Sequence, residues 1–212
     1  MFHAWYSGGF LSEMSDAVRQ VAAFDFDGTI TRADTLGPFL ARVVGRARLY
    51  RSLLLRSPVL AATFVGIADR DAEKERLCGR LLAGRAAQDV TDVGITYAAE
   101  LLAARPFRKE MLDRIAWHRS ENHKVVVVSA SLNVYLEPLA RDLGIDHVIC
   151  TSLEVDSAGT ITGKLVGGNV RGPEKARRLQ TWLGDGPVEI WAYGNSNGDR
   201  ELLAMANHAE WV

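Results

Sequence analysis

Cysteine is scarce in this sequence, which contains Cys78 and Cys150 and no others. Cys78 falls in a stretch with helical periodicity, and Cys150 falls at the end of an apolar run. Two cysteines in such places argue against a disulfide framework and indicate a reducing environment. We therefore expect a cytoplasmic protein.

An excess of charge of one sign is also missing. The 25 basic and 26 acidic residues give a formal net charge of -1, so no nucleic-acid partner is expected. The apolar stretches are too short to span a membrane. Residues 1–20 lack the basic start, apolar core and cleavage site of a signal peptide. They are expected to form an N-terminal extension, with Met14 as an alternative start.

The strongest signal in the chain is an apolar run that ends in two carboxylates and a glycine. Residues 21–24, Val-Ala-Ala-Phe, are followed at once by Asp25, Phe26, Asp27 and Gly28. Such a run predicts a buried parallel strand that breaks into a turn at its carboxyl end, where open α/β sheets place ligands. Side chains alternate along a strand, so Asp25 and Asp27 are expected to point the same way.

Two carboxylates in one small volume resist ionising together. They require a shared proton, a cation, or one group that stays protonated as an acid. A strand end capped by turn-forming Asp and Gly is the alternative explanation of the same residues. The choice depends on whether further polar groups reach the same edge of the sheet.

A long interval separates this strand from the next strand-like run, at residues 124–129. Because structureless loops of that size are rare in compact domains, residues 34–105 are expected to be an inserted unit. Leucines and valines recur there at helical spacing, which predicts a helical bundle. Strands and helices alternate later in the chain, which predicts an α/β core of residues 21–33 and 106–212. Residues 210–212 are expected to begin a further element.

Two serines follow a run of four valines that predicts another buried strand. The sequence after the valines is Ser129, Ala130 and Ser131. A hydroxyl at the carboxyl end of a strand, beside the free N–H groups of a helix start, can bind a phosphate oxygen. Capping of the following helix is the alternative role for either serine.

A lysine and a polar loop come later in the chain. Lys175 lies in the first turn of a helix predicted for residues 173–183, where a cation is unfavourable unless it reaches an anion. Asn195 and Asp199 follow an apolar strand, and their spacing suits oxygen coordination of a hard cation. A solvated surface lysine and a plain turn are the alternatives.

These segments together resemble the four motifs of the haloacid dehalogenase (HAD) superfamily. Asp-Phe-Asp-Gly-Thr from residue 25 is similar to the first motif, Ser129 to the second and Lys175 to the third. Residues 194–199 resemble the fourth, with Asn195 in place of the usual acid. The resemblance implies an α/β fold with a Rossmann-like three-layer parallel sheet core (the HAD fold) and an inserted helical-bundle cap of the C1 type.

The resemblance also implies a phosphomonoester hydrolase that acts through an aspartyl-phosphate. Asp25 is then the nucleophile, and Asp27 protonates the leaving alcohol before it removes a proton from water. Ser129 and Lys175 bind the phosphate. Mg²⁺ is expected as the cofactor, on residues that come from the first and fourth motifs: Asp25, Asp27 (through its backbone carbonyl), Asn195 and Asp199. Three residues of the motif loops are expected to contact the substrate: Gly28, Ala130 and Ser131.

The inserted unit resembles the cap of the phosphoserine phosphatase-like subgroup (subfamily IB), so a small phosphorylated metabolite is the expected substrate. In that subgroup an acid after the first motif and a cap arginine hold phosphoserine. Asp34 and Arg76 are the matching residues here. Asp34 has an alternative role as a helix cap, and Arg76 can instead pair with an acid three residues earlier.

Other functions compete with this one. The arginines of residues 42–56 alternate with apolar residues, and a basic amphipathic helix can lie on an anionic membrane. A phosphatase of lipid phosphates, of the phosphatidylglycerophosphate or lysophosphatidate type, is therefore an alternative, as is one acting on another small metabolite such as histidinol phosphate. The third hypothesis is a non-catalytic HAD protein that binds phosphate. It predicts loss of Asp25 or Asp27, and both are present.

Overall fold

The computed structural model describes residues 18–54 and 70–212. Most of the expected N-terminal extension, and Arg56 of the basic stretch, lie outside the described residues. The division into extension, core and cap at the predicted boundaries stays a prediction.

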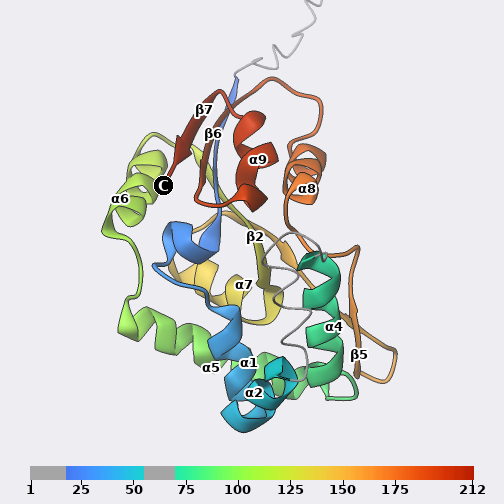
Figure 1. Cartoon of the computed structure of the whole chain (residues 1–212). Coiled ribbons are helices and arrows are strands. Elements are labelled where there is room, and N and C mark those ends of the chain that lie inside the picture. The colour runs from blue at the N-terminus through green and yellow to red at the C-terminus, as the bar shows by residue number, and fades with distance from the viewer. Residues whose placement is uncertain (1–17, 55–69) are drawn as a thin grey trace, which may run out of the picture.

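Parallel strands form a central five-stranded sheet with the order β3-β2-β1-β6-β7 (Figure 1). The strands are β1 (Arg19–Phe24), β2 (Lys124–Leu132), β3 (His147–Thr151), β6 (Val188–Gly194) and β7 (His208–Trp211). The predicted parallel sheet is thus confirmed, with β1 at its centre. The prediction that residues 210–212 begin a new element was wrong, because Glu210 and Trp211 end β7.

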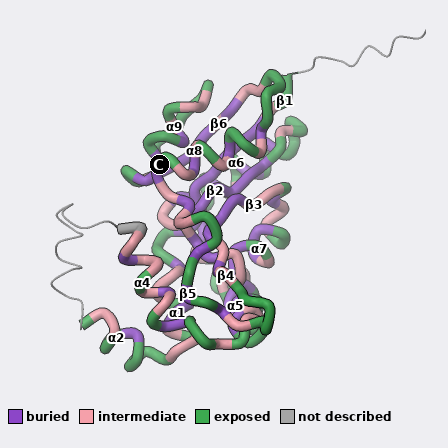
Figure 2. Tube along the Cα trace, turned by 90° about the vertical axis from the view of Figure 1, so that its right-hand side faces the viewer, coloured by how far each residue is buried: buried purple, intermediate pink, exposed green. Residues whose placement is uncertain are grey.

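Helices cover both faces of the sheet. One face packs against α6 (Lys109–Ser120) and α7 (Asn133–Asp142), and the other against α8 (Pro173–Leu183) and α9 (Arg200–Ala204). Alternate residues of β1 enter the two cores: Phe24 faces α6 and α7, whereas Val21 faces α8 and α9. Both sides of the strand are buried (Figure 2), which explains its continuous apolar sequence.

A helical insert lies beyond the carboxyl ends of the strands, between β1 and β2 in the chain (Figure 1). Its described helices are α1 (Leu36–Val44), α2 (Arg46–Leu54), α4 (Arg70–Leu82) and α5 (Ala87–Ala104). Leu40, Leu49 and Leu81 are buried, as their spacing predicts, but Leu54 is 72% exposed. The predicted helical cap is therefore present in the described residues.

A hairpin of β4 (Leu153–Val155) and β5 (Ile161–Leu165) packs on helix α4 of the insert. The two elements approach closely where two glycines meet, since a Cβ added to Gly163 would lie 2.9 Å from the Gly79 Cα. No local signal in the sequence predicts the contact of this hairpin with α4. This contact determines where α4 lies relative to the core.

Candidate active site

Asp25 stands where β1 ends and the chain turns toward the insert. Its backbone N–H donates to the Tyr193 carbonyl of β6 at 2.9 Å, which fixes the strand end. The following turn, Phe26–Ile30, contains Gly28 with a φ of +81°. A Cβ at Gly28 would lie 2.1 Å from Asn195 Nδ2, so glycine is required for this close approach as well as for the backbone angle.

A buried lysine joins the first and fourth motifs. Lys175 Nζ from α8 donates to Asp25 Oδ1 at 2.5 Å and to Asp199 Oδ1 at 2.6 Å. Burial raises the pKa of Asp25 against the opposing effect of Lys175. Burial would lower the pKa of Lys175, but the two carboxylates outweigh it and leave the pKa raised. Two carboxylates around one ammonium leave one negative charge in excess.

The polar loop after β6 holds Asp199 in one orientation. Asp199 Oδ2 accepts from the backbone N–H of Asn195 at 3.2 Å and from the N–H and hydroxyl of Ser196 at 2.9 and 2.7 Å. Both oxygens of Asp199 are therefore occupied by donors. Asn195 Oδ1, by contrast, is buried and has no hydrogen-bond partner among the described residues. An unpartnered buried acceptor of this kind calls for a ligand.

The residues present fit a hard divalent cation. The unpartnered amide oxygen of Asn195 lies in the loop that holds Asp199, and the excess negative charge lies on Asp25 and Asp199. Oxygen atoms of carboxylates, carbonyls and amides are the ligands that Mg²⁺ prefers. Within residues 18–54 and 70–212 no three His, Cys, Asp or Glu side chains form a metal cluster, so an amide or carbonyl must complete the set.

Asp27 has a different environment from Asp25. Its Oδ1 accepts from the backbone N–H and hydroxyl of Thr35 at 3.0 and 2.7 Å, and its Oδ2 accepts from the Ser131 hydroxyl at 2.7 Å. Burial raises the pKa of Asp27 to about 6, and the charge of Asp34 acts in the same direction. A carboxyl group with such a pKa can give up and regain a proton near neutral pH.

Several residues that hold the two carboxylates were not predicted. The Thr29 hydroxyl donates to Asp25 Oδ2 at 3.0 Å. Thr35 is itself held by Tyr135, whose hydroxyl lies 3.1 Å from Thr35 Oγ1, and by Tyr97, whose hydroxyl donates to the Thr35 carbonyl at 3.0 Å. Thr29 is part of the first motif and could have been found there. The tyrosines carry no such signal, because buried aromatics are usually core residues.

The predicted phosphate loop lies inside β2 rather than after it. The strand continues to Leu132 with a register shift against β3 between Ser129 and Leu132, so it does not end at Val128. Ser129 is buried, and its hydroxyl oxygen accepts from the Ser131 backbone N–H at 3.1 Å. Because Ser131 also bonds to Asp27, the structure brings the second motif next to the first.

The two residues predicted to bind the ends of phosphoserine have other partners here. Asp34 is exposed, and its Oδ2 accepts from the Gly37 backbone N–H at 3.0 Å, as a cap of α1. Its negative charge nevertheless raises the pKa of Asp27. Arg76 is 59% exposed and pairs with Glu73 at 2.5 Å. Both alternatives raised by the sequence are thus present, and substrate binding by Asp34 and Arg76 stays a prediction.

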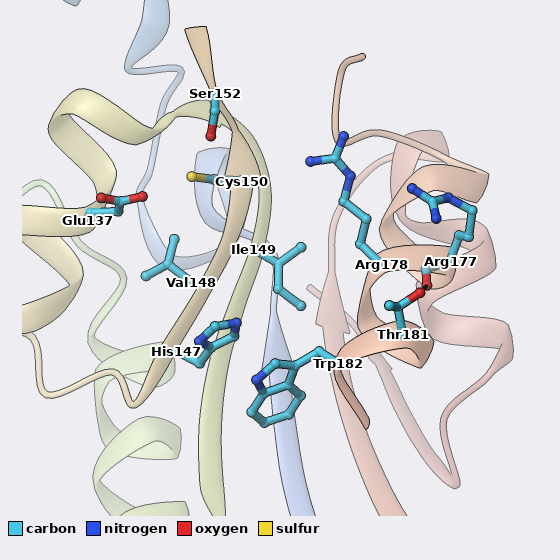
Figure 3. Close-up of a pocket in the computed structure, with 10 residues that line it drawn as sticks. All are labelled: Glu137, His147, Val148, Ile149, Cys150, Ser152, Arg177, Arg178, Thr181 and Trp182. Carbon is cyan, nitrogen blue, oxygen red and sulfur yellow. Dashed lines mark hydrogen bonds between the residues drawn. The ribbon is translucent and has the colours of Figure 1, made fainter. Parts of the chain in front are cut away.

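A separate pocket of about 470 Å³ lies between β3 and α8 (Figure 3). His147 and Trp182 stack at its lower end, with ring centroids 4.9 Å apart. Arg177 and Arg178 extend from α8, but both pair with Glu174 at 2.7 and 2.6 Å. None of the candidate catalytic residues lines this pocket.

Comparison with known proteins gives a consistent result. The family described as haloacid dehalogenase-like hydrolase matches residues 22–204. Protein CicA of Caulobacter vibrioides is 32% identical over 189 residues, which cover 88% of this chain and 83% of that protein. The probable phosphatase Rv3661 of Mycobacterium tuberculosis is 30% identical over 200 residues, covering 92% and 69%.

A solved structure shares the fold. It is a phospho-aspartyl intermediate analogue of phosphoserine phosphatase, with a TM-score of 0.64 and 17% sequence identity over 91% of this chain and 85% of that one. At this identity the similarity concerns the fold alone. The predicted α/β fold with a parallel sheet core and an inserted cap is confirmed.

Proposed function

Because the chain belongs to the haloacid dehalogenase-like hydrolases and is a phosphatase of that family, we propose that it hydrolyses a phosphomonoester through a phosphorylated Asp25. One observation carries the proposal. Asp25 forms an ion pair with a buried lysine, whereas Asp27, two residues later, has a pKa of about 6. Two neighbouring carboxyl groups with such different environments suit a nucleophile and a general acid.

In the first step an oxygen of Asp25 attacks phosphorus, and the bond between phosphorus and the leaving oxygen breaks. The leaving oxygen keeps the electron pair and takes the proton of Asp27. A carboxylate about 4 Å from a phosphate dianion meets roughly 8 kcal/mol of repulsion at an effective dielectric constant of 20. Lys175 and the Ser129 hydroxyl reduce this cost by binding phosphate oxygens.

In the second step water attacks the phosphorus of the phosphorylated Asp25. Asp27, now ionised, removes a proton from the water, and the bond between phosphorus and the Asp25 oxygen breaks. Inorganic phosphate leaves, Asp25 is restored, and Asp27 again carries its proton. Thr35 and Ser131 hold Asp27 in place through both steps because they bond to different oxygens of its carboxyl group.

Mg²⁺ is the proposed cofactor, and when bound it supplies positive charge that offsets the charge of the phosphate. Asp25, the Asp27 carbonyl and Asn195 are the proposed direct ligands. Asn195 is favoured over Asp199 because its side-chain oxygen has no partner, whereas Asp199 Oδ2 already accepts three hydrogen bonds and Asp199 Oδ1 accepts one from Lys175. Asp199 is then the residue that holds Lys175 and the loop.

The test is Mg²⁺-dependent turnover of p-nitrophenyl phosphate by the wild type and by Asp25→Asn. The variant is expected to lose activity, because an amide is a poor nucleophile. Acid-quenched wild-type protein is expected to gain the mass of one phosphoryl group on the peptide that contains Asp25. Activity that persists in Asp25→Asn would rule out this nucleophile.

The proposed substrate is phosphoserine or a similar small metabolite. The support is the resemblance of the insert to the phosphoserine phosphatase cap and the fold shared with a phosphoserine phosphatase. A screen of phosphoserine, histidinol phosphate, sugar phosphates and lysophosphatidic acid separates the candidates. Selective turnover of lysophosphatidic acid would overturn the metabolite assignment.

A lipid phosphate is the second candidate, favoured by the surface of α2. This helix exposes Arg46, Arg48 and Arg51 and has no acidic residue, and Tyr50 is 61% exposed. A groove of about 610 Å³ runs between α1 and α2. Among the described helices, none is both long and apolar enough to cross a membrane. Sedimentation with phosphatidylglycerol vesicles, but not with phosphatidylcholine vesicles, would support contact through α2.

A further inference from the structure

One residue of the insert reaches the second motif directly. Lys74, on helix α4, donates from Nζ to the Ala130 carbonyl and, at 2.9 Å, to Asn169 Oδ1. Ala130 lies between the two serines assigned to phosphate and acid positioning. Lys74 is 56 residues away from Ala130 in the chain, and its sequence context resembles that of any charged residue on a helix surface.

The peptide bond between Ala130 and Ser131 is held at both ends. Its carbonyl oxygen accepts from Lys74, and its N–H donates to the Ser129 hydroxyl oxygen at 3.1 Å. A trans peptide is planar, and its C=O and N–H point in opposite directions, so these two bonds fix the plane. Ser129 uses an acceptor position in this bond, which leaves its hydroxyl hydrogen to donate elsewhere.

The same peptide affects the general acid. Ser131 Oγ donates to Asp27 Oδ2 at 2.7 Å and so holds one oxygen of the general acid in place. A Ser131 backbone that is free to rotate would weaken that bond. The bond between Lys74 and Ala130 is charge-assisted, and such bonds are about twice as strong as neutral ones.

The position of Lys74 is fixed by packing on both sides. Helix α4 lies against β5 through Gly79 and Gly163, and Glu75 Oε1 accepts from the Leu165 backbone N–H at 3.3 Å. On the other side, Asn169 Oδ1 also accepts from the Thr151 hydroxyl at 2.9 Å. The ammonium therefore meets the phosphate loop at a place determined by two parts of the core.

We propose that Lys74 is a positioning residue of the phosphatase reaction: from the helical insert it fixes the Ala130–Ser131 peptide, and so orients the Ser129 and Ser131 hydroxyls. This inference rests on the proposed function. If Lys74 has this role, activity depends on how the insert packs against the core, although Lys74 itself does not have to contact the substrate.

The test compares Lys74→Met, which keeps the length of the side chain, with Lys74→Arg, which keeps the charge. For p-nitrophenyl phosphate, Lys74→Met is expected to lower kcat about tenfold, and Lys74→Arg to recover part of the loss. For an alkyl phosphate, whose leaving oxygen needs the proton of Asp27, the loss of kcat in Lys74→Met is expected to be larger than for p-nitrophenyl phosphate. A purely structural role would lower kcat equally for the two substrates.

Lys109→Met is the matched control, because Lys109 is exposed on α6 and pairs with Asp113. It is expected to leave activity unchanged. If Lys74→Met does not fold, Asn169→Ala takes its place, with a smaller loss of kcat expected. A folded Lys74→Met with unchanged kcat, or with equal losses for the two substrates, would overturn the inference, and so would an unchanged Asn169→Ala. A wild type without phosphatase activity would overturn the proposed function, and this inference with it.

Discussion

At the residue scale, the proton on Asp27 decides which reactions proceed. Burial raises the pKa of Asp27 to about 6, and bonds from Ser131 and Thr35 oppose this rise. Hydrolysis of an alkyl phosphate requires the protonated form, so activity is expected to fall as the pH rises above this value. The negative charge of Asp34 adds to this rise in pKa, although the hydrogen bond of its own carboxylate is to the Gly37 backbone N–H.

Ser131→Ala tests this account of Asp27. The substitution removes a hydrogen bond that lowers the pKa of Asp27, so the pKa is expected to rise further above about 6. The high-pH limb of kcat/KM for an alkyl phosphate should therefore move to higher pH. The same limb measured with p-nitrophenyl phosphate, whose leaving group needs no proton, serves as the control. A shift to lower pH would contradict the assignment of Asp27 as the acid.

At the scale of elements, α6 is joined to the sheet by a buried histidine. His118 Nε2 lies 2.9 Å from the Tyr193 hydroxyl of β6, and its Nδ1 lies 2.9 Å from His123 Nδ1. Burial, helped by the neighbouring His123, lowers the pKa of His118 to about 4. The folded protein therefore keeps this ring neutral at a pH where the unfolded chain protonates it.

The free energy of unfolding is expected to depend on His118 between about pH 4 and 6.5. In this window the unfolded state binds more protons, so stability falls as the pH is lowered, by up to roughly 3 kcal/mol. Asp27 acts in the opposite direction, because its raised pKa gives the folded state the extra proton. The comparison of His118→Gln with the wild type isolates the histidine.

Urea unfolding at pH 5 and pH 7.5 measures this effect. Lowering the pH from 7.5 to 5 should reduce the free energy of unfolding more in the wild type than in His118→Gln. His208→Gln is the control, because His208 is an exposed histidine on β7. An equal pH dependence in wild type and His118→Gln would show that His118 is not the group responsible.

The contact between α4 and β5 gives a second prediction at this scale. Gly163→Ala places a methyl group 2.9 Å from the Gly79 Cα at a φ of +91°, and is expected to lower the free energy of unfolding by about 2–3 kcal/mol. Gly159→Ala has a similar φ of +78° but open space around it, so only about 1 kcal/mol is expected. Equal losses in the two variants would show that the close approach is unimportant.

At the scale of the whole molecule, the candidate metal site joins segments that are far apart in the chain. Asp25 follows β1, and Asn195 follows β6, yet Gly28 and Asn195 are in contact. A ligand that binds only the folded arrangement stabilises it by mass action. Mg²⁺ is therefore expected to raise Tm in the wild type.

Asn195→Asp tests the metal site. The added carboxylate places a further negative charge near Asp25 and Asp199, so Tm without metal is expected to fall. With Mg²⁺ the same charge becomes a stronger ligand, and the rise in Tm should exceed that of the wild type. Ca²⁺-free buffer with chelator provides the reference. A Tm that does not respond to Mg²⁺ in either protein would contradict the assigned ligands.

The sequence predicted secondary-structure elements more fully than it predicted contacts between side chains. Helix α8 was predicted at residues 173–183 and is found there, because proline in its first turn and glycine after its end are local signals. The position of Lys175 against Asp25 followed from the resemblance to a family rather than from spacing. The sequence left two roles open for Arg76, binding of the substrate and pairing with Glu73, because each role needs a cation at that position. The structure has the pairing with Glu73.

The sequence by itself determined the strand that leads into Asp25 and Asp27, the glycine beside them and the helical nature of the insert, because periodicity and turn chemistry are local properties. Only the tertiary structure decided that Thr35 and Ser131 hold Asp27, that Asn195 keeps an unpartnered oxygen, and that Lys74 reaches Ala130. The reason is physical. The partner of a polar side chain depends on how distant elements pack, and no short stretch of residues contains that information.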